Sequence, residues 1–479
     1  MEKNQIFQTV IEDMSEQGEG IGKVNGYTLF IKDTVIGDRI EGKVIKAKKN
    51  YGFGRMMKVL EPSPFRVKPA CSVAAPCGGC QLQAVSYERQ LKFKEDKVKN
   101  HLLRIGGFSE ECLPMKPIIG MEEMMPFGDK WNATESSEVY RYEGCGPFRY
   151  RNKGQFPFGR SKDGRIIYGF YAGRTHSIIE AEDCLLGAPV NRKILDTIRS
   201  FMEEYKIEPY DELCHGGLVR HALIRVGYHT GEIMVCLVIN GDRLPGSRAL
   251  AERLMEMEGM TSVSLNINKE KTNVILGEKM IYLAGQPYIT DKIGDLSYRI
   301  SPQSFYQVNP VQTERLYGKA LEFAGLTGRE TVWDLYCGIG TISLFLARKA
   351  RQVYGVEIVP AAIENAKENA ALNGLSNTEF FVGRAEEVLP RWYREHEGAA
   401  ADVIVVDPPR KGCDEALLNT MVQMHPERIV YVSCDSATLA RDLKYLCGEG
   451  YELQRVQPVD MFPQGVHVET VVLMSRVKE

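Results

Sequence analysis

The fold of this chain is decided by the stretch Val332-Trp333-Asp334-Leu335-Tyr336-Cys337-Gly338-Ile339-Gly340-Thr341. It begins apolar, passes an acidic residue and enters a glycine-rich turn, and residues 342–347 after it are typical of a helix. A strand, a tight glycine turn and a helix form the opening unit of nucleotide-binding α/β folds. Glycines in the turn let a ligand approach the backbone where a side chain would collide with it. The stretch therefore predicts a Rossmann-like domain.

Two acidic residues indicate the ligand of this domain. A second predicted strand, residues 353–356, ends at Glu357, about 20 residues beyond Asp334, where such folds place a carboxylate on the ribose hydroxyls. A dinucleotide turn reads G-x-G-x-x-G, whereas Asp334 here precedes the glycines and would repel a pyrophosphate. S-adenosylmethionine, which carries a sulfonium and an amino group, fits better than NAD. The alternative is an ordinary buried turn without a ligand.

Length and composition limit the classes of protein that remain. The 479 residues suffice for about two to four domains, and the fractions of 44% hydrophobic and 26% charged residues are typical of soluble globular proteins. The net charge of −3 requires any nucleic-acid surface to be a local basic patch. We find no signal-peptide core and no run of roughly 20 apolar residues that would span a membrane. Twelve cysteines in so long a chain indicate reduced thiols and a cytoplasmic protein.

Residues 5–60 are expected to form a small β-barrel, because short strand-like segments alternate with glycines. Across residues 41–60 only Glu41 opposes a set of basic side chains, which are Lys43, Lys46, Lys48, Lys49, Arg55 and Lys58. Tyr51 and Phe53 are interleaved with them, which favours RNA contact through phosphates and stacked bases, although a solvated basic edge strand is the alternative. Gly18-Glu19-Gly20-Ile21-Gly22 and Gly37-Asp38 resemble a TRAM domain, an RNA-binding barrel of RNA-modifying enzymes.

A compact cysteine cluster follows the barrel. Cys71, Cys77 and Cys80 are joined through Gly78-Gly79, which would let three sulfurs converge. Three thiolates need a fourth ligand to close a zinc site or a four-iron cluster. The candidates are His101, Cys112, Cys145, Cys184 and Cys214. The spacing does not choose between the two metals, and scattered buried thiols remain the alternative.

The middle of the chain changes from acidic to basic. Residues 121–146 are acidic and irregular, and we expect an inserted surface loop. Asp163 is the only acidic residue in the stretch 147–176. The basic residues of this stretch are Arg149, Arg151, Lys153, Arg160, Lys162, Arg165 and Arg174. Aromatic residues alternate with them, which suits single-stranded RNA, although a sheet with one wet face gives the same pattern. The side-chain amide of Gln307, in the polar connector 301–309, is able to hydrogen-bond a base or a cofactor. The alternative is a purely structural role.

Two further predicted strands end in polar residues. Residues 402–406 lead into Asp407-Pro408-Pro409-Arg410-Lys411-Gly412, and residues 429–432 lead into Ser433-Cys434-Asp435. Ligands of open parallel sheets bind at the carboxyl ends of the strands. We therefore expect both segments to lie beside the glycine turn.

Cys434 is the candidate nucleophile. We expect a helix over residues 437–446 with Ser436 as its N-cap. A cysteine at a strand end, ahead of a helix N-terminus and beside Arg410, is placed to be a reactive thiolate. Otherwise it would be a small buried hydrophobic residue.

Four motifs together resemble the RNA uracil-5-methyltransferases, which use S-adenosylmethionine. They are Asp334-Leu335-Tyr336-Cys337-Gly338-Ile339-Gly340, Asp407-Pro408-Pro409-Arg410-Lys411-Gly412, Ser433-Cys434-Asp435 and Val468-Glu469-Thr470-Val471. The barrel and the cysteine cluster resemble the ribosomal-RNA branch of that family. The resemblance covers the chain apart from 121–146. Cys434-Asp435-Ser436 stands where many relatives carry Cys-Asn-Pro, so the thiol is kept and the turn after it differs.

The resemblance implies a role for each candidate residue. It implies that S-adenosylmethionine is bound by Gln307, Tyr336, Glu357 and Asp407. It implies that Cys434 is the nucleophile and Glu469 the base. It also implies that Cys71, Cys77, Cys80 and Cys184 hold a [4Fe-4S] cluster, which we expect to be structural because no step of the reaction moves an electron.

The implied reaction explains these residue types. C5 of uracil is too weak a nucleophile to take a methyl group unaided, and thiolate attack at C6 makes it enolate-like. The sulfonium methyl then transfers to C5, a carboxylate removes the C5 proton, and elimination frees the thiol. A free thiol has a pKa of about 8.5, so the site has to favour the thiolate. The base has to leave its stack, which costs least in unpaired RNA.

Several rival functions are compatible with the same motifs. Asp407-Pro408-Pro409 also resembles the acidic loop of N-methyltransferases that act on exocyclic amines. An inactive RNA-binding or iron–sulfur sensor protein, a cytosine-5-methyltransferase and a transfer-RNA enzyme remain possible as well.

We therefore predict an α/β protein of three domains: a TRAM-like, OB-like β-barrel (1–61), a central β-rich α+β domain with the cluster and an RNA-binding sheet (62–308), and a Rossmann-like class I methyltransferase domain (309–479). The expected partner is 23S ribosomal RNA, at an unpaired or loop uridine. We expect a monomer that binds neither DNA nor membranes.

Overall fold

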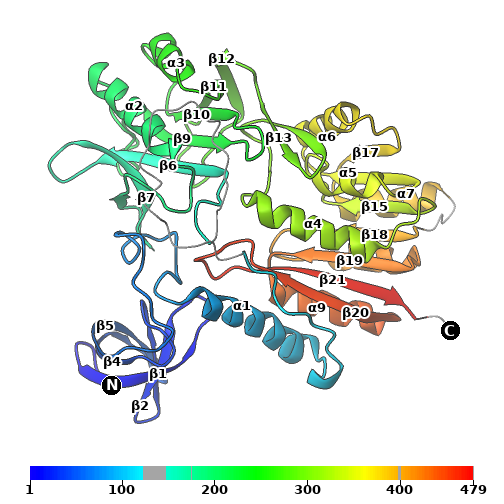
Figure 1. Cartoon of the computed structure of the whole chain (residues 1–479), viewed down its shortest axis with the longest axis horizontal. Coiled ribbons are helices and arrows are strands. Elements are labelled where there is room, and N and C mark those ends of the chain that lie inside the picture. Colours follow the sequence, from blue (N-terminus) through cyan, green and yellow to red (C-terminus); the bar gives the residue numbers. More distant parts are fainter. Residues whose placement is uncertain (122–146, 174, 397–400, 478–479) are drawn as a thin grey trace.

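The computed structural model describes residues 1–121, 147–173, 175–396 and 401–477, which form a barrel, two large sheets and a hairpin (Figure 1). Apart from Met121, the expected insertion at 121–146 lies outside the described residues, and so does Cys145. None of the helices in the described ranges combines the length and hydrophobicity that a membrane crossing requires.

The barrel is built from the first five strands, in the order β1-β2-β3-β5-β4. Their bounds are β1 (Ile6–Met14), β2 (Gly20–Val24), β3 (Tyr27–Ile31), β4 (Arg39–Ala47) and β5 (Tyr51–Glu61). Alternate side chains of β1 and β4 point inward, so Phe7, Ile11, Ile40 and Val44 share one small core. The polar positions between them face outward, as the period of a strand dictates. The predicted barrel is confirmed.

A mixed seven-stranded sheet forms the middle of the molecule, in the order β12-β11-β10-β9-β6-β7-β8. Its strands are β6 (Lys153–Arg160), β7 (Ile166–Tyr171), β8 (Ile178–Glu180), β9 (Val219–Val226), β10 (Ile233–Ile239), β11 (Met260–Ile267) and β12 (Lys279–Gly285). Helices α2 (Val190–Glu204) and α3 (Ser247–Met255) pack through apolar side chains onto it. The hairpin of β13 (Ile289–Ile293) and β14 (Leu296–Ile300) leads on to the last sheet.

The C-terminal sheet has the order β17-β16-β15-β18-β19-β21-β20. Its strands are β15 (Thr331–Leu335), β16 (Gln352–Glu357), β17 (Thr378–Val382), β18 (Val403–Val406), β19 (Arg428–Ser433), β20 (Tyr451–Val459) and β21 (Glu469–Arg476). The first five in spatial order are parallel, and β21 is antiparallel to both of its neighbours. In β18, Val403 and Val405 enter one core and Ile404 and Val406 the other. Both faces are therefore covered, as continuous apolar strands require.

Helices cover both faces of this sheet (Figure 1). They are α4 (Pro310–Ala324), α5 (Thr341–Ala347), α6 (Pro360–Leu372), α7 (Ala385–Glu395), α8 (Glu415–Gln423) and α9 (Ser436–Gly448). The order of elements and the strand order are those of a doubly wound, Rossmann-like domain, which confirms the predicted fold class.

Helix α1 (Tyr87–His101) precedes the central sheet in sequence but packs against the C-terminal domain (Figure 1). Val98 lies in the same core as Leu439 and Leu443 of α9. Lys94 Nζ lies 2.5 Å from the carboxylate of Asp460, which follows β20, and both side chains are fully buried. This buried pair ties α1 to the segment that joins β20 to β21.

Candidate active site

A cavity of about 660 Å³ opens at the carboxyl ends of β15, β16, β18 and β19. The residues predicted to bind the cofactor or to react all line it, and they are Gln307, Tyr336, Glu357, Asp407, Cys434 and Glu469. They come from a connector, four strand ends and the first position of β21. Asp334 and Gly338 line the same cavity. Parallel strands bring their carboxyl ends to one edge of a sheet, which is why distant motifs meet here.

The turn after β15 has an unusual backbone. Tyr336, Gly338 and Gly340 have φ angles of 69°, 56° and 82°. The left-handed region costs an ordinary residue about 1–2 kcal/mol, so Tyr336 is held there by its surroundings, as is frequent at functional sites. The Gly338 N–H donates to Glu357 Oε2 at 3.2 Å, and the Val359 N–H donates to Glu357 Oε1 at 3.0 Å. The turn and Glu357 thus fix each other.

Three carboxyl groups give the cavity an acidic floor: Asp334 and Glu469 are buried, and Asp407 is partly buried. Burial raises the pKa of Asp334 and of Asp407 to about 7 each, and burial together with the charge of Asp407 raises the pKa of Glu469 to about 8. Among the described residues, none of the three makes an ion pair with Lys, Arg or His. Asp334 Oδ2 accepts a hydrogen bond from Ser343, whereas its Oδ1 is buried without a partner. Such a floor suits a cationic ligand.

Gly338 provides the space for that ligand. A Cβ placed on Gly338 would meet no atom within 4 Å, although the residue lines the cavity. The acidic floor, the orphaned Asp334 Oδ1 and this open cradle fit S-adenosylmethionine, which is cationic at its sulfonium and its amino group.

The Cys434 loop differs from expectation at two points. The N-cap of α9 is Asp435, whose carboxylate accepts from the N–H groups of Ala437 and Thr438 at 3.0 and 3.1 Å. Ser436, the predicted cap, is instead the first helical residue. The surroundings of Cys434 also favour the thiol over the expected thiolate in the ligand-free protein. Burial, followed by the charges of Glu469 and Asp407, raises the pKa of Cys434 to about 12, against the smaller opposite effect of Arg410.

His467 is a cavity residue that the sequence did not reveal. It lines the cavity beside Cys434, and its Nε2 lies 3.5 Å from Arg410 Nη2. Burial and the charges of Arg410 and Lys97 lower the pKa of His467 to about 4, so it is neutral at pH 7. Its neighbours come from α1 and from the loop after β18, so no local pattern in the sequence could have indicated it.

The predicted cluster residues Cys71, Cys77, Cys80 and Cys184 line a second cavity of about 250 Å³. Burial is the largest cause of the raised pKa values of Cys77, Cys80 and Cys184, and the charges of neighbouring cysteines add to it. In the part of the chain that the structure describes, no group of three or more His, Cys, Asp or Glu residues has metal-site geometry. The thiols are therefore gathered without forming a closed metal site.

The remaining candidates for a fourth ligand lie elsewhere. His101 makes hydrogen bonds to Ser436 and Glu16, and Cys112 and Cys214 are exposed and outside this cavity. Arg151 and Lys153 line both the cysteine cavity and the active-site cavity, so the two are neighbours.

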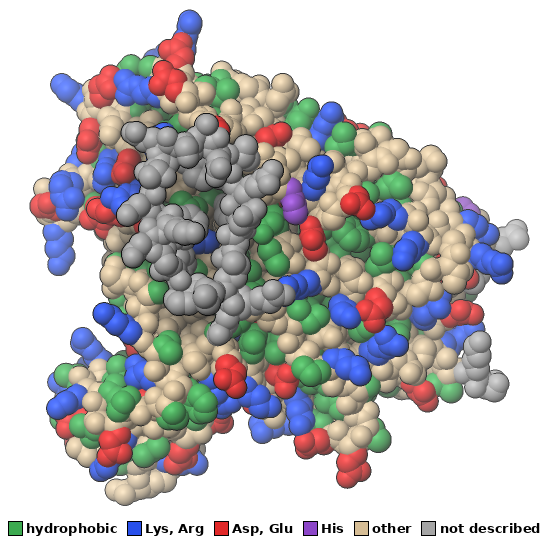
Figure 2. Space-filling view, in the orientation of Figure 1, with side chains coloured by type: hydrophobic (Ala, Val, Ile, Leu, Met, Phe, Trp, Pro, Cys, Tyr) green, Lys and Arg blue, Asp and Glu red, His purple; other side chains and the backbone are tan. Residues whose placement is uncertain are grey.

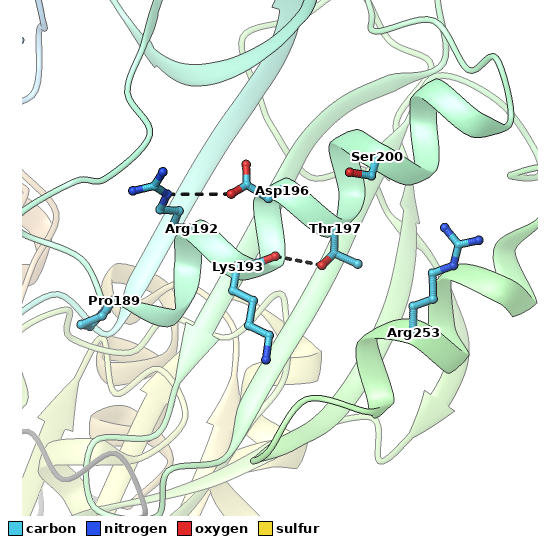
Figure 3. Close-up of a pocket in the computed structure, with 7 residues that line it drawn as sticks. All are labelled: Pro189, Arg192, Lys193, Asp196, Thr197, Ser200 and Arg253. Carbon is cyan, nitrogen blue, oxygen red and sulfur yellow. Dashed lines mark hydrogen bonds and ion pairs between the residues drawn. The ribbon is translucent and has the colours of Figure 1, made fainter. Parts of the chain in front are cut away.

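A groove between α2 and α3 is lined by neither a thiol nor a buried carboxyl group (Figure 3). Both of its arginines are already paired with carboxylates: Arg192 lies 3.1 Å from Glu182, and Arg253 lies 2.7 Å from Glu204. On the face shown in Figure 2, basic and acidic side chains are intermixed. On the barrel, none of the basic residues predicted to contact RNA makes an ion pair within the described ranges.

The doubly wound sheet, the glycine turn and the acidic floor define an S-adenosylmethionine-dependent methyltransferase fold. Comparisons with known proteins narrow the class. The family model described as tRNA (Uracil-5-)-methyltransferase matches residues 196–477, and the model of the TRAM domain matches residues 2–57. The chain therefore belongs to the tRNA (uracil-5-)-methyltransferase family, and it is an RNA methyltransferase with a uracil-5-methyltransferase domain and an N-terminal TRAM domain.

Individual relatives agree with this assignment. An uncharacterized RNA methyltransferase of Halalkalibacterium halodurans is 49% identical over 99% of this chain and 97% of its own length. One from Bacillus cereus is 48% identical over 100% and 98%. The crystal structure of Pyrococcus abyssi tRNA (uracil-54, C5)-methyltransferase in complex with S-adenosyl-L-homocysteine is similar over 98% of this chain and 99% of that one, with 27% identity and a TM-score of 0.74.

Gly338→Ala is expected to weaken S-adenosylmethionine binding by about tenfold, because the new methyl group would occupy open space in the cavity and strain a left-handed residue. Isothermal titration measures the change. Gly374→Ala is the matched control: Gly374 has φ 67° and equally open surroundings but lies outside the cavity. Equal affinities in the two variants would contradict the assignment of this space to the ligand.

Proposed function

We propose that this protein methylates C5 of one or more uridines in 23S ribosomal RNA, with Cys434 as the nucleophile and Glu469 as the base. The observation that carries the proposal is the convergence of this thiol and this carboxyl in one cavity that already has a site for a cationic methyl donor. Glu469 influences the ionisation of Cys434, since the charge of Glu469 is the second largest cause, after burial, of the raised pKa of Cys434.

The chain's own residues take distinct parts in the reaction. Gln307, Tyr336, Glu357 and Asp407 hold S-adenosylmethionine, which supplies the methyl group when bound. Cys434 Sγ forms a bond to C6 of the uracil, and the electron pair moves to C5. After C5 has gained its methyl group, Glu469 takes the C5 proton, the double bond returns and the C6–S bond breaks. Every step balances without an oxidant or reductant.

The raised pKa of Cys434 makes the cofactor a condition for the first step. The thiol is protonated in the ligand-free protein because it is buried near two carboxyl groups. A cation bound over Asp407 and Glu469 would offset their charges and lower the pKa of the thiol. Binding of the cationic cofactor therefore prepares the thiol for attack.

The choice of RNA is the finer part of the proposal. The basic side chains of residues 41–60 in the barrel, which make no ion pair within the described residues, and the cysteine cavity support ribosomal RNA as the substrate, and a ribosomal substrate implies a cytoplasmic enzyme. The similarity to the Pyrococcus abyssi tRNA enzyme favours a second candidate, transfer RNA. Both candidates use the same chemistry, and only the RNA surface distinguishes them.

The test is methylation of ribosomal and transfer RNA from cells lacking the enzyme, with methyl-labelled cofactor, nucleoside analysis and mapping. We expect 5-methyluridine in the large-subunit ribosomal RNA alone. Label in transfer RNA only would establish the second candidate. Label on a ring or exocyclic nitrogen would overturn the reaction itself.

We also propose that Cys71, Cys77, Cys80 and Cys184 hold a [4Fe-4S] cluster with a structural role. Their shared cavity supports this, because a four-iron cluster takes four cysteine thiolates and all four of these thiols line one cavity. Protein purified without oxygen should contain about four irons per chain. Cys184→Ser should lose most of the iron and the visible absorbance, whereas the exposed Cys214→Ser should keep both. Bound zinc without sulfide would contradict the cluster.

A further inference from the structure

A histidine bridge connects the barrel to the segment that carries Cys434. His101, at the end of α1, lies with Nδ1 2.8 Å from Ser436 Oγ and Nε2 2.8 Å from Glu16 Oε1. Glu16 belongs to the turn between β1 and β2 of the barrel, and Ser436 is two residues beyond Cys434. The ring therefore spans three segments that are far apart in the sequence.

The bridge is buried at the end that faces the catalytic segment. Ser436 and His101 are 2% and 9% exposed, whereas the Glu16 side chain is 61% exposed. In the neutral ring, Nε2–H donates to the Glu16 carboxylate and Nδ1 accepts from the Ser436 hydroxyl. Each ring nitrogen thus has the one partner it needs, and the carboxylate selects the tautomer that can accept from Ser436.

Ser436 completes the restraint of the Cys434 segment. Ser433 Oγ donates to the carbonyl of Asp435 and accepts from its N–H, at 2.9 and 3.1 Å. Asp435 caps α9. Cys434 is therefore held between two closed hydrogen-bonded units, and the contact from Ser436 to His101 adds a restraint that reaches it from α1 and the barrel.

We propose that His101 is a positioning residue that couples the seating of the barrel on RNA to the position of Cys434. Glu16 moves with the barrel, and His101 passes the displacement to Ser436 and the Cys434 segment. When bound RNA holds the barrel in its correct position, these contacts align Cys434 Sγ with C6 of the target uracil. The inference rests on the proposed function, because it assumes that Cys434 reacts.

The expected effect is on the rate of reaction and not on binding. A thiol displaced by a fraction of an ångström still admits cofactor and RNA but departs from the attack geometry. His101→Ala and Ser436→Ala should each lower kcat about tenfold, with the KM for RNA and the Kd for S-adenosylmethionine changed less than about twofold. His101→Gln, which keeps a donor and an acceptor, should recover part of the loss.

The experiment uses the full chain with ribosomal RNA that contains 5-fluorouridine. Fluorine replaces the C5 proton, so elimination is blocked and the covalent complex survives denaturation and can be counted. The rate of its formation is measured at saturating cofactor and RNA, beside thermal unfolding of each variant. Glu16→Ala is compared with Glu12→Ala. Glu12 is an exposed acidic residue of the barrel, and its ion-pair partner, Lys23, belongs to the barrel as well.

The outcomes separate the bridge from the proposed function. The bridge is supported if Glu16→Ala slows complex formation and Glu12→Ala does not, and if the His101→Ala/Ser436→Ala double variant is no slower than the slower single variant. It is overturned if His101→Ala or Ser436→Ala forms the complex at the wild-type rate, or if Glu16→Ala behaves like Glu12→Ala. A wild-type enzyme that forms no complex at all overturns the proposed function, and the bridge with it.

Discussion

Cys434→Ala should abolish the formation of 5-methyluridine, with kcat lowered by about 10⁴-fold or more, while the affinity for S-adenosylmethionine changes less than about twofold. The loss should be this large because the other described cysteine that lines the active-site cavity, Cys337, belongs to the turn after β15 and is buried there. Labelled-methyl transfer at saturating RNA measures kcat, and titration calorimetry measures the affinity.

Cys337→Ala is the matched control. Cys337 lines the same cavity, its N–H donates to the carbonyl of Val356 at 2.9 Å, and burial raises the pKa of its thiol well above the ordinary value. It should therefore lose little activity. Activity retained by Cys434→Ala would favour an N-methyltransferase, whose substrate amine attacks through its own lone pair.

The rate of thiol alkylation measures how burial and the neighbouring charges affect the ionisation of Cys434. The raised pKa of Cys434 should make it slow to alkylate at pH 7 in the ligand-free protein, because the thiolate is the reactive form. Bound S-adenosyl-L-homocysteine, which lacks the sulfonium charge, should raise the rate less than S-adenosylmethionine does. The comparison isolates the charge of the ligand from its shape.

The sequence predicted those parts of the site that follow from the topology of the sheet. Asp334, Glu357 and Asp407 each end or follow an apolar strand, and parallel strands gather such ends at one edge, so their meeting was foreseeable. The parts that it missed depend on contacts across the chain. The bond of His101 to Ser436 joins residues 335 positions apart, and no local pattern encodes it.

The ionisation of the site was equally beyond the sequence. A helix N-terminus and an arginine favour a thiolate, and both stand beside Cys434 as expected. Burial and the charges of Glu469 and Asp407 outweigh them, since the pKa of the thiol is raised to about 12. How many acids share one cavity, and how deeply they are buried, is decided by tertiary packing.

Glu469→Gln should stop the reaction at its last stage. We expect kcat to fall by about 10³-fold, within the usual range for the loss of a general base, and a covalent complex with natural RNA to accumulate. The amide keeps the size of the carboxyl group but cannot take the C5 proton, so elimination of Cys434 is blocked. A denaturing gel detects the complex, and the Cys434→Ala/Glu469→Gln double variant should show none.

The pH profiles of the wild-type enzyme and of Glu469→Gln test directly whether Glu469 is the base. Burial and the charge of Asp407 raise the pKa of Glu469 to about 8. A base acts only when ionised, so it is inactive below this pKa and fully active above it. Because Glu469 acts after the methyl transfer, its ionisation should appear in kcat, which should rise with pH and reach a break near pH 8. Glu469→Gln should lack that break. A variant that keeps the break, or a wild-type profile that is flat from pH 6 to pH 9, would assign the proton to a different group.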